Sequence, residues 1–430
     1  MTRIYKLSSE KSILKLILTF SIIVFFRGIQ AQDISQQIIP NRKNGDNQLQ
    51  KPYVILISAD GFRADFKDKF QAKNLQRLSE NGVAAEYMLS SFPSLTFPNH
   101  YSIATGLYPS HHGLVDNSFY DAQRKESYGM SNKKAVADGS WYGGTPLWVL
   151  AEKQQMLSAS FYWVASESDI QGTLPTYYYN YNEKIDIDTR INTVKQWLQL
   201  PEEKRPHIIT FYFPEVDHEA HTYGPDAQQT EEAVHFVDTS IGKLVATVDS
   251  LKLPVNFVFV SDHGMTKVEY VHPMLLPKAI DPEKFIIPRG DALLHLYAKD
   301  PKDIIPTYEA LKKEAKDFDV YLAKDIPKRF HYAKKDDKFN RIGDMLLVPH
   351  LPKVFGITGK PTTPGKHGFD PTIKDMHATF LAWGPAFKPQ TKIKAFENVN
   401  VYPMIATILG LKYDHGIDGK IKNLKPILSK

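Results

Sequence analysis

The stretch YVILIS at residues 53–58 is an uninterrupted apolar run, and the residues ADG follow it directly. Two later runs have the same character, IITFYF at Ile208–Phe213 and VNFVFV at Val255–Val260, and a weaker fourth run, TFLAW, occupies residues 379–383. Strands that are covered on both faces are apolar at every position rather than at alternate positions. The runs therefore predict a buried, mostly parallel sheet.

Helical patterns lie between these runs, for example at residues 74–81 and 230–251. Strands that alternate with helices are typical of an α/β fold in which helices cover both faces of a central sheet. We predict such a catalytic domain over residues 51–430. Residues 266–365 differ, because a short helical pattern lies among several short strand patterns there, and we expect a small α+β insertion.

The N-terminus has the pattern of an export signal, which we place at residues 1–31. Lys11 and Lys15 precede an apolar run at residues 16–26, and Ala31 offers a small residue for cleavage. This run would rise about 16 Å as a helix, too little to span a membrane core of about 30 Å. The alternative is retention as an uncleaved anchor. No other run approaches membrane length, so no span is expected after cleavage.

Residues 32–50 are polar and aperiodic, which predicts a flexible linker. The formal net charge of the chain is +5, and residues 1–31 account for +4 of it, with five basic residues and one acid. The remainder is nearly neutral and gives no support to a nucleic-acid-binding surface. The chain has no cysteine, which excludes disulfides and thiolate metal sites. An exported chain without cysteine fits a periplasmic or secreted bacterial protein.

Carboxylates follow the three strongest apolar runs. Asp60 follows the first run, Asp217 and His221 follow the second, and Asp262 with His263 follows the third. The carboxyl ends of parallel strands meet at one edge of a sheet, where ligands bind, and a mixture of carboxylate oxygen and imidazole nitrogen suits zinc. Taken singly, these are ordinary turn residues, helix caps or a solvated helix face. Their conjunction at three strand ends favours a metal site.

Residues 90–120 contain candidates for a nucleophile. Pro98 and Asn99 are favourable near the start of a helix. A hydroxyl at a helix N-terminus lies near unpaired N–H groups and the positive end of the helix dipole, which suits attack on an anion. Ser94 and Thr96 are both candidates on this chemistry, and a capping hydroxyl is the alternative role.

Five motifs together resemble the nucleotide pyrophosphatase/phosphodiesterase family, which belongs to the alkaline phosphatase superfamily. They are ADGFR at 59–63, FPSLTFPNHYSIATGLYPSHHGLVDNSFYD at 92–121, D-x-x-x-H-x-x-G-P at 217–225, SDHGM at 261–265 and HGFDP at 367–371. The motifs occur in family order, and the insertion, with IPKRFHY and RIGDMLLV, is also similar to that of the family. The absence of cysteine is similar to bacterial members that consist of the core domain.

The resemblance implies two zinc ions. The first would be held by three side chains: Asp217, His221 and His367. The second would be held by four: Asp60, Thr96, Asp262 and His263. Thr96 occupies the position of the family nucleophile, which decides between the two hydroxyls. Asn117 and the backbone amide of Phe97 would donate hydrogen bonds to a phosphoryl oxygen.

Aromatic side chains are candidates for a nucleotide-binding slot: Phe97, Trp163 and Tyr181. Phe97 follows the nucleophile directly, and the other two match positions where the family packs a nucleobase. The alternative for Trp163 and Tyr181 is a core or rim aromatic. The sequence differs from the family pattern at His218, where an imidazole takes the place of the small residue that is expected.

The resemblance implies zinc-dependent hydrolysis of nucleotide phosphodiester or pyrophosphate bonds to nucleoside 5′-monophosphates through a phosphothreonine intermediate. The alternatives are a phosphomonoesterase or a choline-lipid phosphodiesterase of the same superfamily and, from another class, a non-catalytic binding protein. A monoester dianion calls for extra cations. Lys133 and Lys134 follow Asn117 in the chain, but nothing in the sequence indicates that their side chains point into the site.

Overall fold

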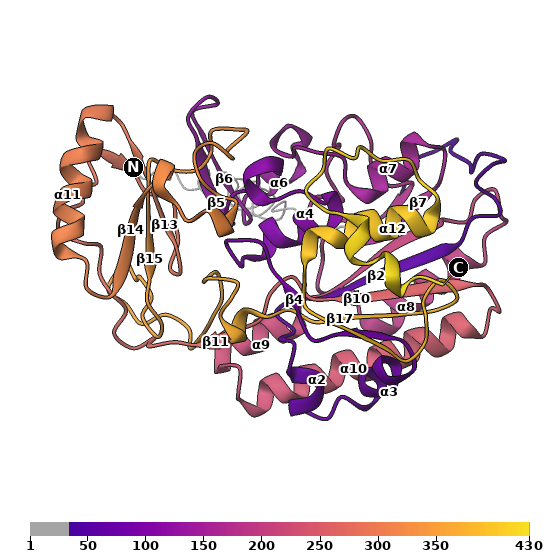
Figure 1. Cartoon of the computed structure of the whole chain (residues 1–430). Helices are drawn as coiled ribbons and strands as arrows, with labels where there is room; N and C mark the ends of the chain where they lie inside the picture. The colour runs from indigo at the N-terminus through magenta and orange to yellow at the C-terminus, as the bar shows by residue number, and fades with distance from the viewer. Residues whose placement is uncertain (1–33, 430) are drawn as a thin grey trace, which may run out of the picture.

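The computed structural model describes residues 34–429. The predicted signal peptide, residues 1–31, lies outside the described residues. Figure 1 shows a large lobe built on a central sheet and a smaller lobe that contains α11 (Ile304–Glu314) and its strands. Over residues 34–429, no helix has the length and apolar character needed to cross a membrane.

The three strongest apolar runs form adjacent strands at the centre of the main sheet: β2 (Tyr53–Ala59), β9 (Ile208–Phe213) and β10 (Val255–Val260). β2 is parallel to both neighbours, and its Ser58 pairs with Tyr212 of β9 and with Val260 of β10. The strands are almost entirely buried, as the continuous apolar runs predict. Because they end at the same level, the residues that follow them meet at one edge.

Within residues 34–429 this sheet has nine strands, in the order β1-β8-β7-β9-β2-β10-β17-β3-β18. The neighbours from β8 to β10 are parallel, whereas β17 (Phe380–Trp383), from the fourth predicted run, is antiparallel to β10. The mostly parallel centre with helices around it confirms the predicted α/β class. The remaining strands of the sheet are β1 (Gln37–Ile38), β3 (Val83–Ala85), β7 (Ser158–Phe161), β8 (Tyr177–Tyr178) and β18 (Thr391–Ile393).

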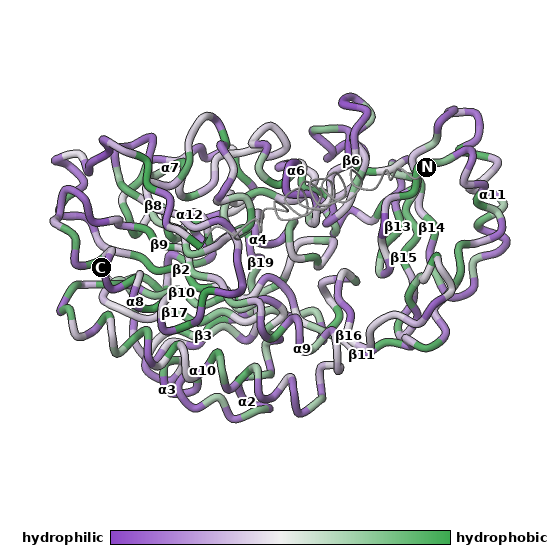
Figure 2. Tube along the Cα trace, turned by 180° about the vertical axis from the view of Figure 1, so that it is seen from behind, coloured by the Kyte–Doolittle hydropathy of each residue, from purple (hydrophilic) through white to green (hydrophobic). Residues whose placement is uncertain are grey.

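Helices cover both faces of the sheet, because alternate residues of β2 enter two different apolar cores. Val54 and Leu56 pack into a core with α4, α7 and α12, and Ile55 and Ile57 pack into another with α3, α8 and α10. Figure 1 shows these helices on opposite sides of the strands, and Figure 2 shows hydrophobic residues concentrated along the strands. The helices are α3 (Lys73–Asn81), α4 (Thr96–Thr105), α7 (Leu147–Lys153), α8 (Ile187–Leu198), α10 (Gln228–Asp249) and α12 (Val401–Leu409).

The smaller lobe is formed by the chain between β11 (Thr266–Lys267) and β16 (Gly365–Lys366). These two strands pair with each other, so the ends of the segment meet. The lobe has an antiparallel sheet in the order β12-β13-β15-β14, with α11 packed on it around a separate apolar core. Its strands are β12 (Phe285–Ile286), β13 (Leu294–Ala298), β14 (Phe318–Leu322) and β15 (Met345–Pro349).

Residues 34–50 pack on the large lobe, so the predicted flexible linker is wrong over this range. β1 pairs with β8, and the buried Asn44 donates through Nδ2 to the carbonyl oxygens of Glu202 and Arg205, at 2.8 Å each. Its Oδ1 accepts a hydrogen bond from the Leu157 amide at 2.7 Å. The polar side chain satisfies backbone groups of distant loops, and composition alone does not reveal such a role.

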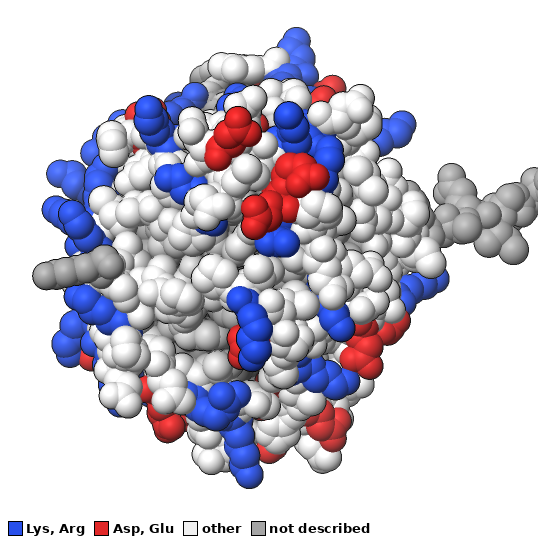
Figure 3. Space-filling view, turned by 90° about the vertical axis from the view of Figure 1, so that its right-hand side faces the viewer, with Lys and Arg blue, Asp and Glu red and all other residues white. Residues whose placement is uncertain are grey.

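Short elements connect the layers: α2 (Phe66–Lys69), β4 (Met88–Leu89), α5 (Pro109–His112), β5 (Ser118–Asp121), β6 (Glu126–Gly129), α6 (Lys133–Ala137), α9 (Glu215–Tyr223) and β19 (Phe396–Glu397). Figure 3 shows one face of the molecule, on which basic and acidic side chains both occur among a larger area of uncharged residues.

Candidate active site

The first group of predicted ligands lies at the carboxyl edge of the main sheet. Asp217 and His221 are one turn apart on α9, and His367 comes from the loop after β16. The Nε2 atoms of the two histidines lie 3.5 and 3.6 Å from Oδ1 of Asp217 and 3.0 Å from each other. These three side chains can hold a metal ion.

The second group lies beside the first, where β2 and β10 end. Nε2 of His263 is 3.4 Å from Oδ1 of Asp60 and 2.9 Å from Oδ2 of Asp262. Oγ1 of Thr96 lies 3.2 Å from the same nitrogen. Asp60, His263 and Asp217 also have ligand atoms within 4.8 Å of one another, so the two groups adjoin.

Backbone carbonyl groups orient the three imidazoles. Each Nδ1 lies 2.8 Å from a carbonyl oxygen, which belongs to Gly365 for His221, to Gly264 for His263 and to Ser94 for His367. A carbonyl oxygen only accepts, so each Nδ1 carries the proton and each Nε2 turns a lone pair towards the other ligands. Two such lone pairs face each other at 3.0 Å, between His221 and His367. Histidines that bind metals are held in this way.

Three buried carboxylate oxygens accept no hydrogen bond from any residue between 34 and 429: Asp60 Oδ1, Asp217 Oδ1 and Asp262 Oδ2. An unpaired buried anion is costly, and a divalent cation removes this cost. Burial, together with the charges of Asp262 and Asp217, raises the pKa of Asp60 well above its usual value. Burial, together with His263 and His221, lowers the pKa of His367 well below its usual value. The donor set therefore fits metal ions.

Thr96 is the first residue of α4, two positions earlier than Pro98, where the sequence placed the helix start. The cap residue Leu95 offers no side-chain hydrogen bond, and the hydroxyl of Thr96 lies at the N-terminal end of the helix, where the following amide, that of Phe97, is bonded to Asn117. The other candidate, Ser94, is buried and donates to the carbonyl oxygen of Phe369 at 2.9 Å. The geometry favours Thr96 as the hydroxyl that faces the ligand groups.

Asn117 lies beside the start of α4, immediately before β5. Its Oδ1 accepts a hydrogen bond from the backbone amide of Phe97 at 2.9 Å. This contact differs from the expectation that both groups donate to one phosphoryl oxygen. The Phe97 amide instead orients the carboxamide, which leaves the Nδ2 hydrogens of Asn117 as donors.

A family model described as Type I phosphodiesterase / nucleotide pyrophosphatase matches residues 54–370. The chain belongs to this family. It is 34% identical over 387 residues to venom phosphodiesterase 2 of Crotalus adamanteus. The aligned region covers 86% of this chain and 47% of that protein. It is 32% identical over 388 residues to ectonucleotide pyrophosphatase/phosphodiesterase family member 3 of Bos taurus, and this aligned region covers 87% of this chain and 44% of that protein. The chain spans about half the length of these curated relatives.

Among solved structures, the fold is similar to murine ectonucleotide pyrophosphatase/phosphodiesterase 5, in an inactive variant in complex with AMP. The TM-score is 0.82 at 27% identity, and the match covers 88% of this chain and all of that one. The family model therefore spans the whole of the smaller lobe and the large lobe from β2 to the loop after β16.

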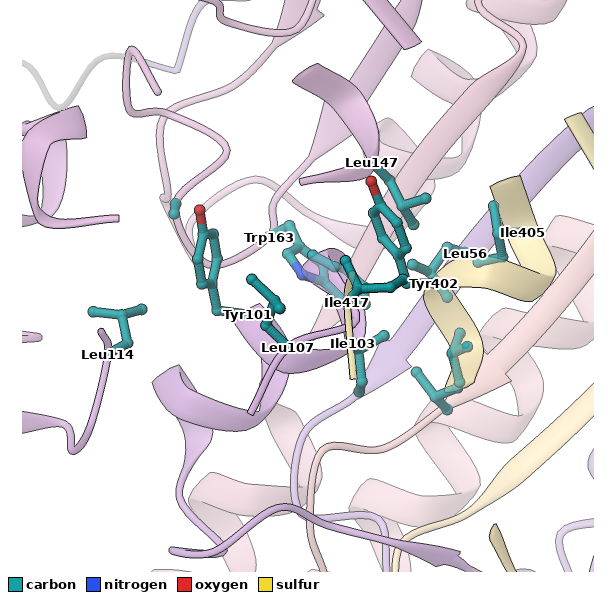
Figure 4. Packing of buried hydrophobic residues seen from close by; sticks show 14 of the residues in the cluster. Leu56, Tyr101, Ile103, Leu107, Leu114, Leu147, Trp163, Tyr402, Ile405 and Ile417 are labelled. Atoms are coloured by element: carbon teal, nitrogen blue, oxygen red, sulfur yellow. The ribbon is translucent and has the colours of Figure 1, made fainter. Parts of the chain in front are cut away.

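The aromatic candidates of this phosphodiesterase-family chain lie in different environments. Trp163 is only 4% exposed, donates through Nε1 to the carbonyl oxygen of His100 at 3.0 Å, and lies in the apolar cluster of Figure 4. This position favours the alternative, a core aromatic, because the ring has no free face on which a base can stack. Tyr181 is 44% exposed, and its ring contacts Tyr212 edge-on at 6.0 Å. Phe97 is half-buried.

Two residues near the ligands were not identified from the sequence. Tyr212, near the end of β9, donates to Oδ2 of Asp60 at 2.5 Å. His100 lies one helical turn after Thr96, with Nδ1 at 3.0 Å from the Thr96 carbonyl oxygen and at 3.3 Å from Oδ2 of Asp262. Burial alone would raise the pKa of Asp262, but His263 and His100 hold it well below its usual value. The spacing of four from Thr96 is the one sequence signal for His100.

Three other candidates lie apart from the ligand groups. His218 is half-exposed and pairs with Glu183 at 3.6 Å, so α9 turns it away from Asp217 and His221. Lys133 and Lys134 are exposed at the start of α6.

Proposed function

We propose that this chain is a zinc-dependent phosphodiesterase that hydrolyses nucleotide phosphodiester or pyrophosphate bonds to nucleoside 5′-monophosphates. One observation carries the proposal: three imidazole lone pairs and three unpaired carboxylate oxygens converge in two adjoining groups beside the hydroxyl of Thr96. Membership of the family and its phosphodiesterase relatives support the reaction type. The AMP complex of the murine relative supports a nucleotide substrate.

Two zinc ions would be held by the two groups. The first group consists of Asp217, His221 and His367. The second consists of Asp60, Asp262 and His263, with Thr96. Bound zinc lowers the pKa of a hydroxyl and offsets negative charge that develops on phosphoryl and leaving oxygens.

Thr96 is the proposed nucleophile. Its hydroxyl oxygen attacks phosphorus, the bond from phosphorus to the leaving oxygen breaks, and the hydroxyl proton passes to solvent. The product is a phosphothreonine that retains the nucleoside. Water then attacks the same phosphorus, the bond to the Thr96 oxygen breaks, a proton of the water returns to that oxygen, and the nucleoside 5′-monophosphate leaves. The name of the murine relative, which records an inactive threonine-to-alanine variant, supports a threonine in this role.

Asn117 is the proposed donor to a non-bridging phosphoryl oxygen. Its carboxamide is oriented before substrate binds, since Oδ1 is occupied by the Phe97 amide. A donor that needs no reorganisation during the reaction stabilises developing charge most effectively. Phe97, next to the nucleophile, and the exposed Tyr181 are the proposed contacts for the organic arm and the base.

The decisive experiment compares three chromogenic substrates on the purified protein: the nitrophenyl ester of thymidine monophosphate, nitrophenyl phosphate and nitrophenyl phosphocholine. We expect the highest kcat/KM with the nucleotide diester, and about two zinc ions per chain by elemental analysis. A preference for the monoester or for phosphocholine would replace this function by one of the two superfamily alternatives. No turnover of any of the three by zinc-loaded protein would favour a binding protein.

We also propose that the chain is exported to the periplasm or secreted, on the basis of the apolar run at residues 16–26 and the charges before it. Cell fractionation with mass spectrometry of the N-terminus tests this location. A cytoplasmic protein that retains residues 1–31 would contradict it.

A further inference from the structure

The segment that carries Asn117 is held from the smaller lobe. Three buried side chains reach the backbone and side chains of residues 113–121: His295 of β13, and Tyr332 and Arg341 of the segment between β14 and β15. None of them belongs to the groups of metal ligands. They contact the segment at both ends and in the middle.

Arg341 fixes the two ends of the segment. Its Nε donates to Oδ2 of Asp121 at 2.8 Å, and its Nη1 donates to the carbonyl oxygen of Gly113 at 3.0 Å. The guanidinium also lies over the ring of Trp141, 5.0 Å from its centroid. A guanidinium holds its donors in one plane, so the distance between the two ends is set by a rigid group.

Tyr332 and His295 hold the middle of the segment. The Tyr332 hydroxyl donates to the carbonyl oxygen of Val115 at 2.5 Å. Nδ1 of His295 accepts a hydrogen bond from the Gly343 amide at 3.3 Å, so Nε2 carries the proton. That nitrogen lies 3.4 Å from Oδ2 of Asp116.

Asp116 connects His295 to the backbone on the far side of Asn117. Its other oxygen, Oδ1, accepts the Ser118 amide at 3.0 Å, so the carboxylate bridges His295 and the peptide on the far side of Asn117. The carbonyl oxygen of Asn117 itself accepts the Met130 amide at 2.9 Å. Hydrogen bonds therefore hold the backbone on both sides of Asn117, and this backbone sets the position from which its side chain projects.

Burying Arg, His and Asp is expensive, and an apolar contact of the same volume can stabilise a protein equally well. The polar contacts differ from apolar packing in that they fix the orientation of the groups that they join. We propose that Tyr332 and His295, with Arg341, are positioning residues: they act on turnover through Asn117, although they belong to the smaller lobe. This inference rests on the proposed function, in which Asn117 donates to the phosphoryl group.

The test is a double-mutant cycle on the zinc-loaded full chain with the nitrophenyl ester of thymidine monophosphate. Asn117→Ala alone is expected to lower kcat by about 10²–10³-fold. Tyr332→Phe keeps the ring, which packs edge-on against Phe92 at 5.3 Å, and removes only the hydroxyl. We expect kcat to fall about tenfold with KM little changed, because a small misplacement of a reacting group is costly.

The two effects should not multiply. In the Asn117→Ala background, Tyr332→Phe is expected to change kcat by less than about twofold, since there is no carboxamide left to misplace. The matched control is Tyr177→Phe on β8, which removes the hydroxyl of another buried tyrosine; this hydroxyl donates to the carbonyl oxygen of Lys204 at 3.0 Å. It should leave kcat unchanged in both backgrounds.

His295, whose Nε2 lies 3.5 Å from the Tyr332 hydroxyl, provides a second variant. His295→Ala is expected to lower kcat, and His295→Gln, whose amide can donate from a position close to Nε2, should restore most of the loss.

Each outcome has a distinct meaning. A normal kcat in Asn117→Ala would refute the proposed role of Asn117 itself. A slow Asn117→Ala enzyme, together with Tyr332→Phe and His295→Ala enzymes at the wild-type kcat, would overturn the positioning inference alone. So would losses that multiply in full with that of Asn117→Ala, since the residues would then act on turnover by another route.

Discussion

Acidification from pH 8 to pH 5 is expected to lower the free energy of unfolding by about 2 kcal/mol through one buried imidazole, that of His112. The ring is fully buried at the end of α5. Its Nδ1 accepts a hydrogen bond from the Leu114 amide at 3.2 Å, so Nε2 carries the proton, 3.0 Å from Oγ of Ser102 and 3.2 Å from the carbonyl oxygen of Pro98. A second proton on Nδ1 would break the bond to Leu114.

The magnitude follows from the two pKa values of this group. Burial lowers the pKa of His112 in the folded protein to about 3, from 6.5. Below pH 6.5 the unfolded chain therefore takes up a proton that the folded chain takes up only near pH 3. Stability falls as the pH falls through this window, by about 1.4 kcal/mol per unit, and does not change above it. Between pH 6.5 and pH 5 the loss is about 2 kcal/mol.

The assay is denaturant unfolding of the wild type and of His112→Asn at several values from pH 8 to pH 5. The Asn carbonyl oxygen can still accept the Leu114 amide, but the side chain does not titrate. We expect the variant to be less stable at pH 8, by about 1–3 kcal/mol, since it loses ring packing and the donor to Pro98. Other titrating groups are common to both proteins and cancel in the difference.

The gap between the two proteins should therefore shrink by about 2 kcal/mol on going from pH 8 to pH 5. A gap that stays constant over this range would refute the reasoning, because His112 would then have the same pKa in the folded and unfolded states.

Three further predictions concern the site. Thr96→Ala is expected to lower kcat on the order of 10⁴-fold, whereas Thr96→Ser should retain far more activity. The unfolding midpoint of Thr96→Ala should change little, because the hydroxyl caps no helix. Equal kcat values for the two variants would show that the hydroxyl is not the nucleophile. Asp217→Asn should lower the zinc content measured by elemental analysis, since Oδ1 of Asp217 faces both ligand groups, and a full complement of zinc in the purified variant would contradict the site. Phe97→Ala should lower kcat/KM for the nucleotide diester more than for a methyl nitrophenyl diester, by about tenfold in the ratio, if the ring packs on the organic arm; equal losses would mean that it does not.

The sequence by itself was sufficient for the strands that build the site. Residues 53–58, 208–213 and 255–260 are apolar at nearly every position, as expected of strands that are covered on both faces, and all three lie at the centre of the sheet. The ligand candidates Asp60, Asp217 and Asp262 could be placed for the same reason, since each lies within four residues of the end of a strand, and the strand ends coincide in a parallel sheet. Asn117 and His367 could be assigned only through the family resemblance, because nothing in their local sequence distinguishes them from turn residues.

Only the tertiary structure decided the residues whose roles depend on what lies opposite them. Asn44 lies in a segment as polar as a linker, yet it satisfies loops more than 100 residues away. The indole ring of Trp163 is of a type that can stack on a base, but it is buried in the apolar core. Tyr332 and His295 reach Val115 and Asp116 from the other lobe, across more than 170 residues of chain. Local patterns carry strand and helix periodicity, but a hydrogen bond between distant segments depends on the packing of whole lobes, which no local pattern contains.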